Sequence, residues 1–112
     1  MKAQPIRIDP IDGYVVCDAF HATHVRLEMP RPENTMRTLI LPVIQRGARE
    51  GTRCWSWNGD TENPTLRPSI LTHGRNENGD WACHSWVNDG VAQFLDDCTH
   101  ELAGQSLPLI DQ

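Results

Sequence analysis

Short runs of alternating apolar and polar residues, separated by residues that favour turns, recur along this chain. Such alternation places every second side chain on the same face of a β-strand, so that one face can pack on a core. The segments 29–35 and 76–80 contain the Pro, Gly and Asn residues that mark surface loops. Strands are predicted at residues 13–17, 23–29, 38–43 and 69–72, with a hairpin after residue 80.

The hairpin over residues 81–100 concentrates side chains that can bind a metal or move a proton. Residues 88–90, Asn-Asp-Gly, tolerate the positive φ that a tight two-residue turn requires. Such a turn pairs even positions of the first strand with odd positions of the second, which sorts the side chains onto two faces. One face carries Cys83, Phe94, Asp96 and Cys98. The opposite face carries His84, Leu95 and Asp97.

One short helix is expected after the hairpin, beginning at Asp96 or Asp97 and ending at Gly104, because glycine favours the left-handed residue that ends a helix. The tail over residues 105–110 can add a final strand. The predicted fold is therefore mainly β, in the β-rich α+β class. It consists of a small antiparallel sheet with one short C-terminal helix, in a single domain spanning residues 1–112.

Composition narrows the class of protein. A chain of 112 residues with 38% hydrophobic content fits one domain with a modest core. The net charge of -5 argues against binding to nucleic acid, which depends on clustered Lys and Arg. No apolar run approaches the roughly 20 residues that span a bilayer, and no signal-peptide core is present, so we expect a cytoplasmic protein. In a reducing cytosol, four Cys are expected to be thiols or metal ligands, not disulfides.

The segment between residues 55 and 70 combines paired Trp and Pro residues. Trp55 and Trp57 share a strand face, and we expect both rings to pack into the core. Pro64 and Pro68 restrict the backbone around them, which predicts a rigid loop over residues 65–69. A rigid loop at this place would present the hydroxyl of Ser69.

Four motifs of the second half of the chain together resemble a known family. They are Trp55-x-Trp-Asn-Gly-Asp, Pro64-Thr-Leu-x-Pro-Ser-Ile70, Cys83-His-Ser-Trp-Val-x-Asp-Gly90 and Phe94-Leu-x-Asp-Cys-Thr-His-x-Leu-Ala-Gly-Gln105. In this order they resemble a small uncharacterised family of tailed phages and prophages, whose members are often mislabelled as ammonia monooxygenases. Distant relatives lie beside bacterial ubiquitin-like conjugation genes, where a peptidase role has been suggested. The resemblance implies a phage or prophage protein in the cytosol of a bacterial host.

The resemblance also implies a structural zinc site. In the wider family a Cys-Pro-x-Cys element, often followed by His, precedes the Trp motif. The corresponding place here is Cys17-Asp-Ala-Phe-His-Ala-Thr-His24, where the second Cys is replaced by Phe20. His21 can substitute for it only if the loop repositions the imidazole.

A metal site can thus draw ligands from two parts of the chain. Zinc takes four N or S donors in a tetrahedron, and a small domain gains folding free energy from such a site. Adjacent Cys83 and His84 cannot both reach one ion from a regular strand, and Cys98 and His100 can do so only if the chain bends. The alternative is that the thiols are small buried apolar groups. The candidate ligands are Cys17, His21 or His24, then Cys83 or His84, then Cys98 or His100.

The opposite face of the hairpin suggests catalysis. His84 and Asp97 can form a base and its orienting carboxylate, and Ser69 can be the nucleophile. The chain has no Gly-x-Ser-x-Gly elbow, which speaks against this interpretation. A thiol variant would use Cys98, activated by His84 or His100.

Two functions follow from these sites. The first is a phage accessory protein, a metal-binding module that binds a protein partner, with an anti-defence role, because an acidic and loop-rich surface suits protein binding. The alternative is a small hydrolase or peptidase that uses Ser69, His84 and Asp97.

Overall fold

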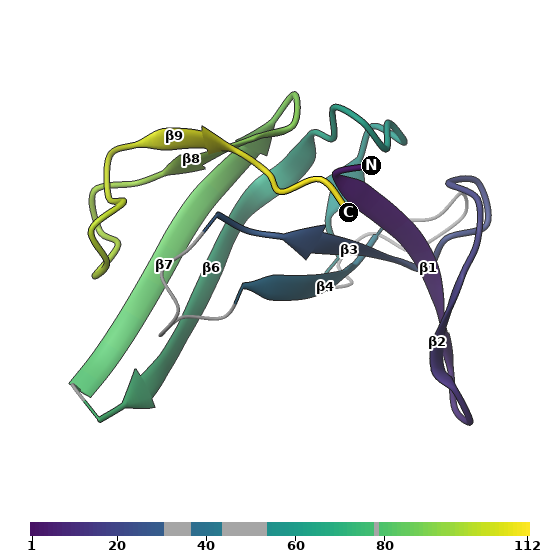
Figure 1. Ribbon diagram of the computed structural model, residues 1–112, viewed down its shortest axis with the longest axis horizontal. Coiled ribbons are helices and arrows are strands. Elements are labelled where there is room, and N and C mark those ends of the chain that lie inside the picture. The colour runs from purple at the N-terminus through teal and green to yellow at the C-terminus, as the bar shows by residue number, and fades with distance from the viewer. Residues whose placement is uncertain (31–36, 44–53, 78) are drawn as a thin grey trace.

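The computed structural model describes residues 1–30, 37–43, 54–77 and 79–112. These residues form two antiparallel sheets, and no helix occurs among them (Figure 1). The described part of the chain is therefore all-β, and the helix predicted to begin at Asp96 or Asp97 and end at Gly104 is wrong. The strands are β1 (Ala3–Asp9), β2 (Gly13–Val16), β3 (His24–Glu28), β4 (Thr38–Pro42), β5 (Ser56–Trp57), β6 (Leu66–Asn76), β7 (Gly79–Asn88), β8 (Val91–Phe94) and β9 (Ser106–Pro108).

The first sheet has the strand order β2-β1-β3-β4. Strands β2, β3 and β4 confirm three of the predicted strands, whereas β1 was not predicted. Pro5 lies in the middle of β1, and a proline normally argues against a strand because it lacks the N–H that a ladder needs. Here Pro5 still contributes its carbonyl, which accepts a hydrogen bond from the Cys17 N–H at 3.1 Å. The β1–β2 hairpin projects away from the second sheet (Figure 1).

The second sheet has the order β5-β6-β7-β8-β9 and is built around the long pair β6 and β7, drawn in teal and green in Figure 1. Strand β6 extends beyond the predicted residues 69–72 in both directions. Asn76 and Gly79 pair with each other, so most of the predicted loop over residues 76–80 belongs to a tight hairpin instead. The other predicted loop, residues 29–35, lies mostly outside the described residues.

The turn between β7 and β8 is the one that the sequence predicts. Asn88 pairs with Val91, and both intervening residues have positive φ, 49° for Asp89 and 77° for Gly90. Positive φ at both positions is the signature of a two-residue turn that matches the twist of the strands. Ser85 pairs with Phe94, so the parity of the pairing, and the sorting of side chains between the two faces, is confirmed.

Side chains from both sheets form one buried core. Trp55 and Trp57 are partly buried and pack against it, as predicted. The buried members of this core are Ala3, Val25, Leu27, Met29, Leu39, Leu41, Val43, Leu66, Ile70, Cys83, Val87, Ala92, Phe94, Cys98 and Leu109.

Residues 95–104 form turns instead of the predicted helix. Their backbone groups bond to β7: the Leu95 N–H donates to the His84 carbonyl at 2.9 Å and the Thr99 N–H to the Ala82 carbonyl at 2.9 Å. A backbone N–H that donates to β7 is not available for a hydrogen bond within a helix. The segment therefore runs along the edge of β7 and does not form the predicted helix. Gly104 has the predicted positive φ, 79°, and the tail then forms β9, as the sequence suggested.

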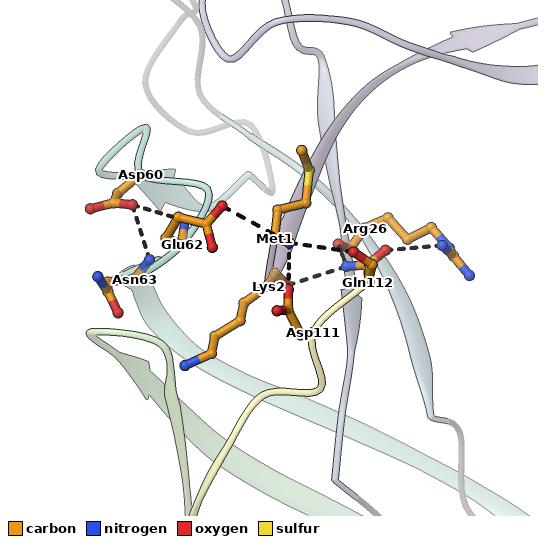
Figure 2. A network of polar contacts seen from close by, with 8 residues as sticks. All are labelled: Met1, Lys2, Arg26, Asp60, Glu62, Asn63, Asp111 and Gln112. Atoms are coloured by element: carbon orange, nitrogen blue, oxygen red, sulfur yellow. Dashed lines mark hydrogen bonds and ion pairs between the residues drawn. The ribbon is translucent and has the colours of Figure 1, made fainter.

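Polar contacts join the two ends of the chain to each other, to β3 of the first sheet and to the turn before β6 of the second sheet, as Figure 2 shows. The Met1 amine donates to the Asp111 carboxylate, which raises the pKa of the amine and lowers the pKa of Asp111. The Gln112 amide donates to the Arg26 carbonyl at 2.8 Å. Near the Met1 amine, the Asp60 carboxylate accepts bonds from two backbone N–H groups of its own turn, which lowers its pKa.

None of the described residues belongs to a helix with the length and apolarity that a membrane crossing by a helix needs.

We expect Gly90→Ala to destabilise the fold more than Gly13→Ala. Both glycines have positive φ, so both substitutions incur a backbone strain of about 1 kcal/mol. A Cβ at residue 90 would also lie 3.2 Å from the backbone oxygen of Glu62, whereas one at residue 13 meets nothing within 4 Å. Urea unfolding monitored by Trp fluorescence measures the difference in the free energy of unfolding. Equal losses for the two variants would contradict the close packing of this turn.

Candidate functional site

Ser69 lies in strand β6, not in the loop that the paired prolines predicted. The pairing of β6 with β7 shifts between Leu66 and Ile70, which pair with Val87 and Ser85. Three residues of β6 therefore stand opposite one residue of β7, and such a bulge re-aims the side chains that it carries. The peptide between Arg67 and Pro68 within this bulge is cis. The irregular strand delivers a half-buried Ser69 to the outer face of the sheet.

The imidazole of His84 lies directly against this serine. His84 pairs with Leu71 across β6 and β7, so Ser69, two residues before Leu71, is its diagonal neighbour on the same face. The Ser69 Oγ and the His84 Nε2 are 2.8 Å apart. This distance is that of a direct hydrogen bond.

The second ring nitrogen of His84 meets a carboxylate. Its Nδ1 is 3.0 Å from Oδ2 of Asp97. Because an ionised carboxylate can only accept, a neutral imidazole in this position would carry its proton on Nδ1, which leaves Nε2 to accept from the hydroxyl of Ser69. The side chain of His84 is 25% exposed and that of Asp97 63% exposed. The structure thus brings together the three residues that the sequence nominated for catalysis.

Asp97 is held in place by the chain on both sides of it. The Cys98 thiol accepts from the His84 N–H at 3.2 Å and donates to the His84 carbonyl at 3.2 Å. Thr99 adds its hydroxyl, which accepts from the Ala82 N–H at 3.0 Å. Together with the bond from the Leu95 N–H, these contacts fasten residues 95–99 along β7. The carboxylate of Asp97 is therefore fixed relative to the backbone of the histidine that it contacts.

A cluster that can hold a metal ion lies on the opposite face of the same hairpin. The ligand atoms of Cys83, Cys98 and His100 lie within 4.8 Å of one another, and the His100 Nε2 is 3.1 Å from the Cys83 Sγ. Both thiols are buried and the imidazole is half-buried. The chain bends at residues 99–100, which is the condition under which both Cys98 and His100 can take part. Cys83, and not His84, faces this cluster.

The N-terminal candidates are not part of the cluster. Within the described part of the chain, the structure does not bring Cys17, His21 or His24 to the three ligand atoms. His21 is exposed and bonds to Asp18 at 2.8 Å. His24 bonds to the Thr23 hydroxyl, and burial lowers its pKa, whereas burial raises the pKa of the Cys17 thiol. A zinc ion tying the N-terminal strands to the hairpin therefore has no support here, because His24 lies in the first sheet and Cys17 and His21 lie in the connection between its strands β2 and β3.

One feature beside the catalytic candidates escaped the sequence analysis. The guanidinium of Arg67 stacks on the ring of Trp86, with its central carbon 5.2 Å from the ring centroid. One guanidinium nitrogen donates to the Leu66 carbonyl at 2.8 Å. Arg67 lies two residues before Ser69 and Trp86 two residues after His84, but the sequence gives no clear signal for the pair, because the irregular pairing of β6 with β7 decides which residues meet.

Comparison with known families gives a match. A family model described as the bacterial ubiquitination-like system serine protease BubE matches residues 34–95, which is more than half of the chain. The matched segment contains Ser69 and His84 and ends two residues before Asp97. Comparison with curated proteins and comparison with solved structures give no match. By the extent of the match, the chain belongs to the BubE family of bacterial ubiquitination-like system serine proteases.

Proposed function

We propose that this protein is a peptidase in which Ser69 is the nucleophile, His84 the general base and Asp97 the group that orients the imidazole. The observation that carries the proposal is the continuous chain of hydrogen bonds, 2.8 Å from Ser69 to His84 and 3.0 Å from His84 to Asp97. This order of groups is the one that activates a serine hydroxyl. Membership of a serine protease family supports it.

The reaction follows from these contacts. The Ser69 Oγ attacks the carbonyl carbon of the peptide bond while the His84 Nε2 takes the hydroxyl proton. The imidazolium is stabilised by Asp97 and gives this proton to the leaving amine as the carbon–nitrogen bond breaks. Water then attacks the acyl-serine ester, with His84 again taking a proton, and the acid product leaves as Ser69 regains its hydroxyl.

The family description places related proteins in a bacterial ubiquitination-like system. We propose that the substrate is a protein of such a system. The protein partner that the sequence analysis expected would then be this substrate. The hydrolase thereby replaces the accessory binding module as the leading function. Phage or prophage origin and an anti-defence role are proposals that rest on the sequence resemblance alone.

We expect Ser69→Ala to abolish covalent labelling by a fluorophosphonate probe and to lower peptidase activity at least about a thousandfold, because the nucleophile is lost. Asp97→Asn should also reduce the labelling rate strongly, because an amide no longer fixes the imidazole tautomer. Ser56→Ala is the matched control, since Ser56 is exposed on the adjacent strand β5. Gel fluorescence and intact mass measure the labelling. Labelling of Ser69→Ala at the rate of the unaltered chain would refute the assignment.

A second proposal is that Cys83, Cys98 and His100 bind a zinc ion. Two thiols and an imidazole suit this metal, and their spacing within 4.8 Å suits a common ion. Cys83 directly precedes His84 and Cys98 directly follows Asp97. An ion bound by both thiols on the inner face would therefore hold together the two segments that carry His84 and Asp97 on the outer face. The buried Ser85 hydroxyl, which has no hydrogen-bond partner in the described structure, lies on the same face of β7 as Cys83.

We expect about one zinc per chain by elemental analysis, and a rise in melting temperature when zinc is added to chelator-treated protein. Binding at a concentration about 100 times the dissociation constant stabilises by about 2.7 kcal/mol. Cys83→Ala and His100→Ala should remove most of this zinc-dependent rise, whereas Cys17→Ala should keep it. The variants are compared by the zinc-dependent rise and not by the melting temperature itself. Replacing a buried side chain by Ala also lowers stability through lost packing. The same melting temperature with and without zinc in the unaltered chain would contradict the site.

A further inference from the structure

The outer face of β6 and β7 carries two cross-strand pairs side by side. Ser69 contacts His84 in one pair, and Arg67 stacks on Trp86 in the other. His84 and Trp86 are two residues apart on one strand, which places their side chains on the same face about 7 Å from each other. An extended peptide advances by about the same distance over two residues. A peptide with its reacting carbonyl at Ser69 would thus bring the residue about two positions away to Arg67.

Hydrogen bonds and stacking hold the guanidinium of Arg67 in place, but no carboxylate of the described residues balances its charge. Its NH1 donates to the carbonyls of Leu66 and Val87, at 2.8 and 3.4 Å, and its flat face lies on Trp86. No carboxylate within the described ranges forms an ion pair with it. By contrast, Arg75 on the same strand pairs with Asp80 at 2.7 Å. The remaining donors of Arg67, at NH2 and Nε, have the fork geometry that binds a carboxylate.

The distribution of charge around the site also favours a substrate carboxylate beside Arg67. The chain as a whole carries a net charge of -5 and repels anions. Asp97 lies against His84, whereas Arg67 belongs to the neighbouring pair with Trp86. A substrate carboxylate would be repelled on the Asp97 side and attracted on the Arg67 side. The charges of Asp97 and Arg67 therefore favour one orientation of the substrate, with its carboxylate beside Arg67.

We propose that Arg67, held on Trp86, is a specificity-determining residue that binds a carboxylate of the substrate within about two residues of the bond that Ser69 attacks. The inference rests on the proposed peptidase function. The carboxylate can come from an Asp or Glu side chain or from the C-terminus of the substrate chain. Both sources present the same bidentate acceptor.

The test compares paired phosphonate reagents that label serine and differ only in a carboxylate or its amide. One pair carries Asp or Asn about two residues from the reactive phosphorus, and a second pair carries a free or an amidated C-terminus at about the same distance. We expect the unaltered protein to react about tenfold faster with the carboxylate member of one pair, as a charge-assisted hydrogen bond at an exposed site allows. The pair that shows the preference identifies the source of the carboxylate.

Arg67→Gln should bring this ratio of rates close to one, and Arg67→Lys should leave an intermediate ratio, because an ammonium keeps the charge without the fork. Arg75→Gln is the matched control and should keep the full ratio. Circular dichroism verifies that each variant is folded. If Arg67→Gln does not fold, Arg67→Lys still tests the proposal. A ratio near one in the unaltered chain, or an unchanged ratio in both Arg67 variants, overturns the carboxylate subsite alone. Failure of every reagent to label Ser69 overturns the peptidase function and this inference with it.

Discussion

The register between β7 and its two neighbours is the constraint on which both candidate sites depend. Adjacent residues of a strand point to opposite faces, so Cys83 and His84 cannot serve one centre. Pairing with β6 brings Ser69 to the histidine, and the two-residue turn at Asp89 and Gly90 brings the returning chain to the same level on the other side. The hydroxyl and carboxylate therefore gather on one face and the thiols and the second imidazole on the other. No long loop is needed to assemble either group.

Much of this arrangement could be predicted from the sequence because it follows from local rules. The turn residues fix the parity of the hairpin, and parity alone assigns His84 and Asp97 to one face. Pairing across β6 could not be deduced in this way, because the bulge before Ser69 changes the register without a clear signal in the residue pattern. The helix was predicted because Gly104 ends a stretch with helical composition. It does not form because the backbone after Leu95 finds donors and acceptors on β7 instead.

The N-terminal part of the chain shows a different limit of sequence reasoning. Cys17 and His24 resembled ligands because their spacing was compared with a motif, and spacing along the chain does not say which sheet a segment joins. Both belong to the first sheet or its connections, whereas the thiols of the cluster belong to the second. The pair of Arg67 and Trp86 was overlooked for the opposite reason. Its members are far apart in sequence and become neighbours only through the pairing of β6 with β7.

The interlocking of the two faces has an evolutionary consequence. An insertion or deletion of one residue between Cys83 and the turn would send the sulfur ligand and the imidazole base to each other's side, and both centres would be lost in a single event. Substitutions can tune either face separately, but changes of length cannot. The segment from Cys83 to His100 should therefore be inherited as one block of constant length, and the pairing of β6 with β7 extends this constraint back to Ser69.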